Sequence, residues 1–210
     1  MTCHDRLLLF TRYPEAGRSK TRLIPALGAD GAARLQRLLT ERMALQARVL
    51  TEKHGIKTVV HYCGGSRKKM TSWVGNLPCV PQARGNLGMR MQAAFRHAFA
   101  AGAGKAVLIG SDIPGIDAKL LADAFAALQN SAVVIGPSHD GGYYLLGICA
   151  DIAEKLFPLL FEGIAWSTPA VFASTYERLA TAAFVPAVLP VLHDIDTPDD
   201  LDFARTQGLI

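Results

Sequence analysis

A basic loop near the start of the chain has the composition of a phosphate-binding segment. Residues 11–23 read Thr-Arg-Tyr-Pro-Glu-Ala-Gly-Arg-Ser-Lys-Thr-Arg-Leu, in which Arg18, Lys20 and Arg22 alternate with polar residues. Alternating cations on a loop suit the charge of a diphosphate or a triphosphate. The loop is not a P-loop, because the pattern G-x-x-x-x-G-K-[ST] is absent. The alternative interpretation is an ordinary basic surface loop.

Carboxylates follow two apolar segments further along the chain. Asp112 stands in Gly-Ser-Asp-Ile-Pro, and Asp194 and Asp196 alternate in His-Asp-Ile-Asp. Because hard cations prefer carboxylate oxygens, Asp112 is a candidate ligand for Mg²⁺ or Mn²⁺, with a turn residue as the alternative. Asp194 and Asp196 would repel each other without a nearby cation. A metal ion shared between Asp112 and one of these two would remove that repulsion.

The segment Gly-Pro-Ser-His-Asp-Gly-Gly-Tyr-Tyr-Leu suits contact with a sugar or an acceptor. Its two glycines, Gly141 and Gly142, let the backbone approach a ligand closely. Asp140 can face an acceptor hydroxyl, and Tyr143 offers a stacking face and a hydroxyl group. The alternative is a hairpin turn, for which Asp-Gly is a leading signal.

These segments must be positioned by strands and helices that alternate along the chain. Apolar and β-branched runs predict strands over residues 6–11, 57–63, 106–109, 132–135, 143–148 and 188–192. Helical spacing, with Asp117 as an N-cap and Thr197 in a capping box, predicts helices over 29–52, 89–101, 118–129, 167–179 and onward from 197. A basic stretch that begins Ser66-Arg-Lys-Lys is predicted to be a loop.

This order of elements predicts one α/β domain over residues 1–210, with a largely parallel sheet covered on both faces. The closely spaced strands around Asp140 are expected to put one antiparallel strand into the sheet. In such sheets ligands bind beyond the carboxyl ends of the strands, which is where the candidate segments lie.

Composition limits the remaining classes of function. The chain has 210 residues, of which 50% are hydrophobic and 19% charged, as in proteins that fold around a core. No apolar run approaches the roughly 20 residues that cross a bilayer, and no secretory signal is recognised, so we expect a cytoplasmic protein. The formal charge of +4 is modest and the basic clusters lack interleaved aromatic residues, which argues against nucleic acid as a partner.

The cysteines are far apart and are expected to be reduced, structural thiols: Cys3, Cys63, Cys79 and Cys149. Two apolar segments, 157–161 and 188–192, suit either the core or a homodimer interface, and the sequence does not separate these uses.

Six segments in order resemble a bacterial family of GT-A-like glycosyltransferases, within the nucleotide-diphospho-sugar transferase superfamily that is related to cofactor guanylyltransferases. The segments span nearly the whole chain: Phe10-Thr-Arg-Tyr-Pro-Glu-Ala-Gly-Arg-Ser-Lys-Thr-Arg-Leu, Gly85-Asn-Leu-Gly-Met-Arg-Met, Ile109-Gly-Ser-Asp-Ile-Pro, Gly136-Pro-Ser-His-Asp-Gly-Gly-Tyr-Tyr-Leu-Leu-Gly, Trp166-Ser-Thr and Asp194-Ile-Asp-Thr-Pro-Asp-Asp-Leu. The sequence departs from the family pattern at Thr11, where a lysine is usual, and at Asn86, where an aspartate is expected.

The resemblance implies a three-layer α/β/α sandwich with a mixed, mainly parallel sheet and a nucleotide held over the first strand and its loop. Nucleotide contacts would come from Thr11, Arg12, Gly17, Lys20, Arg22, Gly85, Asn86, Leu87, Gly88 and Ser111. Metal ligands for Mg²⁺ or Mn²⁺ would come from Asp112, Asp194 and Asp196. The acceptor or sugar would meet Asp140, Gly141, Gly142, Tyr143 and Trp166, although Trp166 equally suits a buried helix anchor. Asp140, Lys20 and Arg22 would carry catalysis.

Three functions are consistent with these residues. In the first, a metal-dependent glycosyltransferase moves a sugar from a nucleoside diphosphate to a small-molecule acceptor while a base near Asp140 activates the acceptor hydroxyl. In the second, a nucleotidyltransferase moves a nucleoside monophosphate from a triphosphate to a phosphorylated small molecule and releases pyrophosphate. In the third, Thr11 and Asn86 mark a nucleotide-binding module without catalysis. The base, the sugar, the acceptor, the anomeric outcome and the oligomeric state are not fixed by the sequence.

Overall fold

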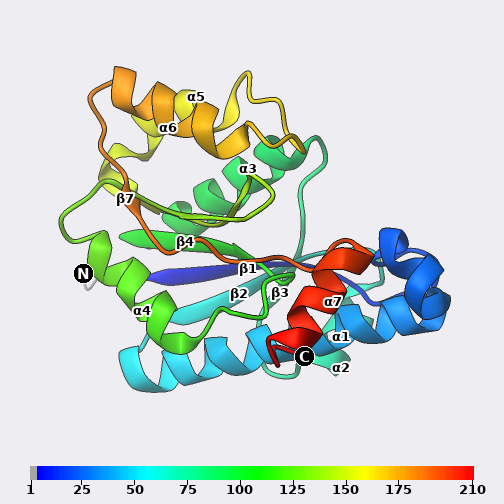
Figure 1. Ribbon diagram of the computed structural model, residues 1–210. Helices are drawn as coiled ribbons and strands as arrows, with labels where there is room; N and C mark the ends of the chain where they lie inside the picture. The colour runs from blue at the N-terminus through cyan, green and yellow to red at the C-terminus, as the bar shows by residue number, and fades with distance from the viewer. Residues whose placement is uncertain (1–3) are drawn as a thin grey trace.

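A seven-stranded mixed sheet forms the centre of the molecule, in a computed structural model that describes residues 4–210 (Figure 1). The strands lie in the order β3-β2-β1-β4-β6-β5-β7. Their bounds are β1 Arg6–Arg12, β2 Lys57–Cys63, β3 Cys79–Pro81, β4 Lys105–Gly110, β5 Val133–Pro137, β6 Tyr143–Cys149 and β7 Ala187–Val188. Only β6 runs antiparallel to its neighbours β4 and β5 among these strands, in agreement with the one antiparallel strand that was predicted. The predicted α/β sandwich with a mainly parallel sheet is confirmed.

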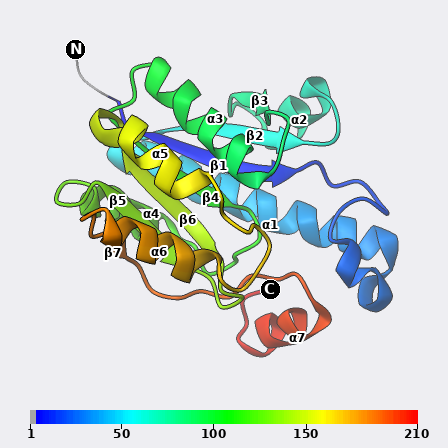
Figure 2. The ribbon, with the colours of Figure 1, turned by 90° about the horizontal axis from the view of Figure 1, so that it is seen from above.

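Helices cover both faces of this sheet (Figures 1 and 2). One face carries α1, α2 and α4, and the other carries α3, α5 and α6, while α7 lies beside the first part of α1. The bounds are α1 Ile24–His54, α2 Arg67–Val74, α3 Leu87–Ala100, α4 Ala118–Ala127, α5 Ala153–Phe161, α6 Val171–Thr181 and α7 Pro198–Thr206, with short 3₁₀ turns η1 Thr21–Leu23 and η2 Ala150–Ile152.

The central strand β1 is buried on both faces because side chains alternate along a strand. Leu7 and Leu9 pack toward α1, and Leu8 and Phe10 pack toward α3. Burial of each leucine is worth about 2 kcal/mol by area. This rigid strand therefore fixes where Arg12 and the basic loop leave the sheet.

Two helix starts agree with the local sequence signals. Asp117 accepts a hydrogen bond from Leu120 N at 2.7 Å and caps α4. Thr197 and Asp200 form the predicted capping box at the start of α7. Side-chain caps depend on residues within one turn, so sequence identifies them well.

The basic stretch after Ser66 was wrongly predicted to be a loop, because it forms helix α2. Ser66 Oγ caps the helix by accepting a hydrogen bond from Lys69 N at 3.3 Å. Met70 and Val74, four residues apart, are buried against the sheet. Trp73 also packs, partly buried, against this cluster, and three consecutive basic residues obscure the short apolar pattern in the sequence.

The boundaries of β7 and α6 also differ from those predicted. The first difference lies at a proline and the second near a residue with a left-handed φ. Strand β7 spans only Ala187–Val188 because Pro190 has no N–H for the ladder, although Leu192 N still donates to Pro137 O at 3.2 Å. Helix α6 begins at Val171 because Ser167 has a left-handed φ of 65°. Strand β3 and helix α5 were not predicted, and α5 buries Phe157, Leu160 and Phe161 of the apolar segment 157–161 in the core.

The thiols Cys63, Cys79 and Cys149 are free, as expected, and Cys3 lies outside the described residues. Within residues 4–210 no helix is long and apolar enough to cross a bilayer.

Candidate active site

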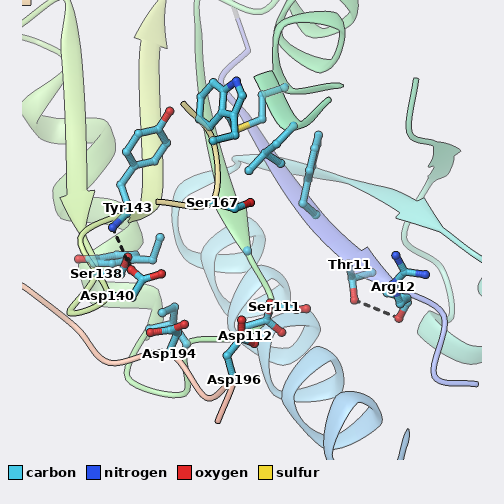
Figure 3. A pocket seen from close by; sticks show the side chains of 18 of the residues that line it. Thr11, Arg12, Ser111, Asp112, Ser138, Asp140, Tyr143, Ser167, Asp194 and Asp196 are labelled. Carbon is cyan, nitrogen blue, oxygen red and sulfur yellow. Dashed lines mark hydrogen bonds between the residues drawn. The ribbon is translucent and has the colours of Figure 1, made fainter. Parts of the chain in front are cut away.

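A cleft of about 790 Å³ opens where β1 and β4 end and where β5 turns into β6. The segments 166–169 and 194–196 complete its wall. Figure 3 shows Asp112, Asp194 and Asp196 together at one side of it, with Asp140 next to Asp194 and Arg12 across the cleft. The cleft thus brings together residues from all four segments that the sequence indicated.

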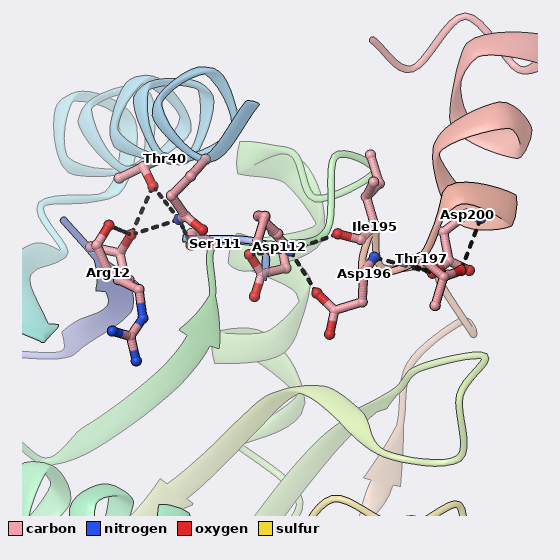
Figure 4. A network of polar contacts seen from close by, with 11 residues as sticks. Arg12, Thr40, Ser111, Asp112, Ile195, Asp196, Thr197 and Asp200 are labelled. Carbon is pink, nitrogen blue, oxygen red and sulfur yellow. Dashed lines mark hydrogen bonds and ion pairs between the residues drawn. The ribbon is translucent and has the colours of Figure 1, made fainter. Parts of the chain in front are cut away.

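Lys20 holds two of the candidate metal ligands together. Its Nζ donates to Asp196 Oδ1 at 2.7 Å and to Ile195 O at 2.6 Å, and it lies 2.8 Å from Asp112 Oδ1. Figure 4 shows Asp112 close to Ile195 and Asp196. The lysine side chain is only 4% exposed. Burial opposes its charge, but the carboxylates of Asp112 and Asp196 outweigh burial and raise the pKa of Lys20. Two of the three N–H donors of the ammonium therefore hydrogen-bond to Asp196 and Ile195, and the charge also forms an ion pair with Asp112.

The clamp made by Lys20 predicts a measurable loss of stability in Lys20→Met. Two carboxylates would lose their cation, and because these are 42% and 44% exposed the cost is expected to be about 2 kcal/mol, below that of a fully buried pair. Urea unfolding at neutral pH measures this cost. The double variant Lys20→Met/Asp196→Asn should lose less free energy of unfolding than the sum of the losses in the two single variants. Losses that simply add would contradict the clamp. Since the pKa of Lys20 is raised from 10.5, the stabilisation persists at lower pH and is lost only above that value.

Asp194 belongs to the same acidic group, and among residues 4–210 no lysine or arginine forms an ion pair with it. Burial, and then the charges of Asp140 and Asp196, raise the pKa of Asp194 to about 6. Asp140 is itself ordered, because its Oδ1 accepts hydrogen bonds from Ser138 Oγ and from Gly142 N. Asp194 therefore lies within electrostatic reach of two other carboxylates, Asp140 and Asp196, whose charges oppose its ionisation.

Asp194→Asn is expected to raise Tm at neutral pH and to leave it nearly unchanged near pH 3.8. The folded state binds the proton of Asp194 more tightly than the unfolded chain, since its pKa is about 6 against 3.8. This contribution is fully present below pH 3.8 and is lost as the pH rises through about 6, so the ionised side chain destabilises the fold above that range. Thermal unfolding of both proteins across this range, without divalent metal, checks the sign. A pH-independent difference would show that charge is not the cause.

A buried polar layer supports the floor of the cleft. Thr11 Oγ1 and Thr40 Oγ1 are 2.7 Å apart, and Gln36 Nε2 donates to Ser111 Oγ at 3.1 Å. Thr11 and Ser111 line the cleft, as the nucleotide prediction requires, but their hydroxyls bond to the α1 side chains. A threonine at position 11 therefore joins β1 to α1.

Two glycines accommodate the segment that precedes α6. A Cβ on Gly88 would lie 2.7 Å from the Trp166 indole, and one on Gly141 would lie 2.1 Å from Pro169 O. Phe172 N also donates to Gly141 O at 2.9 Å. The close approach expected at Gly141 is thus to the protein's own backbone.

The sequence of the chain matches one family of bacterial proteins. The sequence model of a family described as "Uncharacterized protein conserved in bacteria (DUF2064)" matches residues 44–168. The chain belongs to this family. No curated protein matches the DUF2064 chain.

Solved structures place the DUF2064 chain in a known fold. A provisionally named nucleotide-diphospho-sugar transferase from Desulfovibrio desulfuricans G20 is 33% identical, with a TM-score of 0.89 over 98% of this chain and 88% of that one. CMP:2-keto-3-deoxy-manno-octonic acid synthetase, complexed with CTP, is 14% identical with a TM-score of 0.57 over 98% of each chain. Rv0371c from Mycobacterium tuberculosis H37Rv, complexed with manganese, is 15% identical with a TM-score of 0.52 over 96% of this chain and 97% of that one. The last two show a shared fold.

The predicted site residues of this DUF2064 protein divide into two groups. Those lining the cleft are Thr11, Arg12, Lys20, Arg22, Leu87, Ser111, Asp112, Asp140, Gly142, Tyr143, Trp166, Asp194 and Asp196. The others, Gly17, Gly85, Asn86, Gly88 and Gly141, shape turns or contacts around it. Asn86 is the N-cap of α3, where its Oδ1 accepts a hydrogen bond from Met89 N at 2.9 Å.

Several residues of the cleft were not predicted. Arg90 donates to Gln82 Oε1 at 2.9 Å, and Gln82 Nε2 donates to His61 O at 3.0 Å. Gln82 follows β3, a strand too short to recognise, so its place at the sheet edge had no signal. Ser138 was identifiable in principle, since it stands two residues before Asp140 and bonds to it.

Proposed function

We propose that the protein is a metal-dependent glycosyltransferase that uses a nucleoside-diphosphate sugar and a small-molecule acceptor. The observation that carries the proposal is the shared cleft, in which carboxylates from three separate segments face the cationic loop after β1. The name of the 33%-identical protein from Desulfovibrio desulfuricans G20 supports this class of donor.

Mg²⁺ or Mn²⁺ fits the chemistry of this site, with Asp112, Asp194 and Asp196 as its proposed ligands. Lys20 contacts one oxygen each of Asp112 and Asp196, and Asp194 carries a charge that no lysine or arginine pairs with among the described residues. Within residues 4–210 no three acidic, histidine or cysteine side chains already converge as a metal site. Mg²⁺ in proteins is commonly held by one or two carboxylates together with substrate phosphates, so this donor set suits a metal that binds with a nucleotide. When bound, the ion would offset charge on the leaving diphosphate.

The basic loop would hold the diphosphate through arginines. Arg12, Arg18 and Arg22 line the cleft, and their planar guanidinium groups can bind phosphate oxygens in pairs. The predicted contact of Lys20 with the diphosphate would require one of its three protein contacts to break. We therefore propose that Lys20 sets the positions of Asp112 and Asp196 while the arginines bind the phosphates.

Asp140 is the proposed base for the transfer. The acceptor oxygen forms a bond to the anomeric carbon, while the bond from that carbon to the diphosphate oxygen breaks and its electron pair leaves with the nucleoside diphosphate. The acceptor proton passes to Asp140, whose Oδ2 is free of the hydrogen bonds that hold Oδ1. Ser138 and Gly142 thus orient the base before the acceptor arrives.

Nucleotidyl transfer is the second candidate, because three arginines and Lys20 on one loop also suit a triphosphate. A thermal-shift screen separates the two. UDP-, GDP-, ADP- and dTDP-sugars are compared with UTP, GTP, ATP and CTP, each with and without Mn²⁺. A manganese-dependent shift with one nucleotide sugar, followed by its turnover, supports glycosyl transfer. A shift with triphosphates alone supports nucleotidyl transfer, and nucleotide binding without turnover supports a noncatalytic module.

A further inference from the structure

One arm of the cleft differs chemically from the rest. Beyond the carboxylates and arginines, its wall is apolar and is formed by Leu87, Met91, Leu108, Leu146, Tyr143 and Trp166. The rings of Tyr143 and Trp166 meet edge to face with centroids 6.3 Å apart. Figure 3 shows the Tyr143 ring extending away from Asp140. The apolar arm therefore lies on the far side of Tyr143 from the proposed base. Phosphates and divalent metal have no polar partner among these leucine and methionine side chains.

The hydroxyl of Tyr143 is a polar group within this apolar arm. It is buried and has no hydrogen-bond partner in the described part of the chain. Burial raises the pKa of Tyr143, so the group stays protonated and can both donate and accept. Buried polar groups nearly always have a partner, and leaving one unpaired costs stability. The neighbouring Tyr144 shows the usual case, since its hydroxyl donates to Pro190 O at 3.0 Å.

We propose that the apolar arm binds the acceptor, and that the acceptor is an alcohol built on an apolar ring with a second polar group that hydrogen-bonds to Tyr143. The ring would lie along Tyr143 and Trp166, and the reacting hydroxyl would lie toward Asp140. Trp166 belongs to the connection before α6, which packs tightly on Gly88 and Gly141, so this wall holds the indole in a fixed place against which a ring can lie. The acceptor role rests on the proposed transfer reaction, whereas the binding of a ring alcohol does not.

Trp166 provides a direct probe, because the chain has 2 tryptophans and Trp73→Phe leaves Trp166 alone. Trp73 lies outside the cleft and bonds to Glu41 Oε1 at 2.8 Å. Fluorescence of this variant is titrated with 4-hydroxybenzyl alcohol, benzyl alcohol and glycerol, without nucleotide. Both ring alcohols should change the emission and glycerol should not. The phenolic ligand should bind about fivefold more tightly, as expected for one net hydrogen bond.

Tyr143→Phe and Tyr144→Phe, each in the Trp73→Phe background, decide whether the buried hydroxyl is the cause. Tyr143→Phe should abolish the fivefold preference and leave Tm unchanged or higher, because it removes an unpaired group. Tyr144→Phe should lower Tm, since it breaks a formed hydrogen bond, and should keep the preference. No response to either ring alcohol, or a preference that survives Tyr143→Phe, would overturn the inference.

The nucleotide thermal-shift screen tests the proposed transfer reaction, and the ring-alcohol titration tests the apolar arm as a binding site. Ring-alcohol binding in a protein that shifts with no nucleotide would support the apolar arm as a binding site and would count against the proposed transfer. A nucleotide-dependent shift without any ring-alcohol response would overturn the inference and leave the proposed function standing.

Discussion

Asp112→Asn is expected to lower metal-dependent turnover by about a thousandfold, which corresponds to roughly 4 kcal/mol of barrier. Asp112 follows β4 directly, and its backbone carbonyl accepts a hydrogen bond from Ile195 N at 3.1 Å, so the two acidic segments are tied together at this point. The asparagine keeps the size of the side chain but removes the charge that a divalent cation needs. The Mn²⁺-dependent part of the nucleotide thermal shift should disappear with it.

Two further measurements make this expectation specific. Without nucleotide or metal, the Tm of Asp112→Asn should stay close to that of the unsubstituted protein, since Lys20 keeps Asp196 and Ile195 as partners. Asp123→Asn serves as the matched control, because Asp123 pairs with Lys119 on an exposed face of α4 and lies outside the cleft. An undiminished Mn²⁺-dependent shift in Asp112→Asn would remove Asp112 from the proposed metal site.

Gly141→Ala is expected to cost about 4 kcal/mol of folding free energy, from two additive causes. Gly141 has a left-handed φ of 85°, which an alanine adopts at a cost of about 1–2 kcal/mol. The added Cβ would also lie 2.1 Å from Pro169 O, an impossible approach to a backbone atom, so the segment before α6 must move. Ligand affinity should fall as well, because Trp166 and the apolar arm move with that segment.

Gly102→Ala separates the two causes. Gly102 has the same φ of 85°, and a Cβ there would meet nothing within 4 Å. Its alanine variant should therefore show only the conformational cost of about 1–2 kcal/mol. Urea unfolding of both variants measures the difference. Equal losses in the two would mean that the segment at Pro169 yields freely, against the tight contact described here.

The sequence correctly predicted that the candidate segments of this site follow strands of the sheet. The aspartate after β4, the basic loop after β1 and the Asp-Gly-Gly turn all follow strands that apolar runs identify. The carboxyl ends of parallel strands meet at one sheet edge, which is why these segments share a cleft. The presence of one antiparallel strand followed from the short connection around Asp140, because only antiparallel strands can be joined so briefly, and the structure shows that this strand is β6.

Sequence by itself therefore determined the strand–helix order and the local caps, including Asp117 and Thr197, because those depend on periodicity and on hydrogen bonds within a turn. Only the tertiary structure decided which groups meet across the cleft. Lys20 and Asp196, 176 positions apart, share an ion pair that no local pattern encodes. Likewise, the glycine at 141 accommodates Pro169 rather than open space, and the hydroxyl of Tyr143 has no hydrogen-bond partner within residues 4–210. Such contacts depend on how the sheet brings distant segments together, so their physical cause lies in packing.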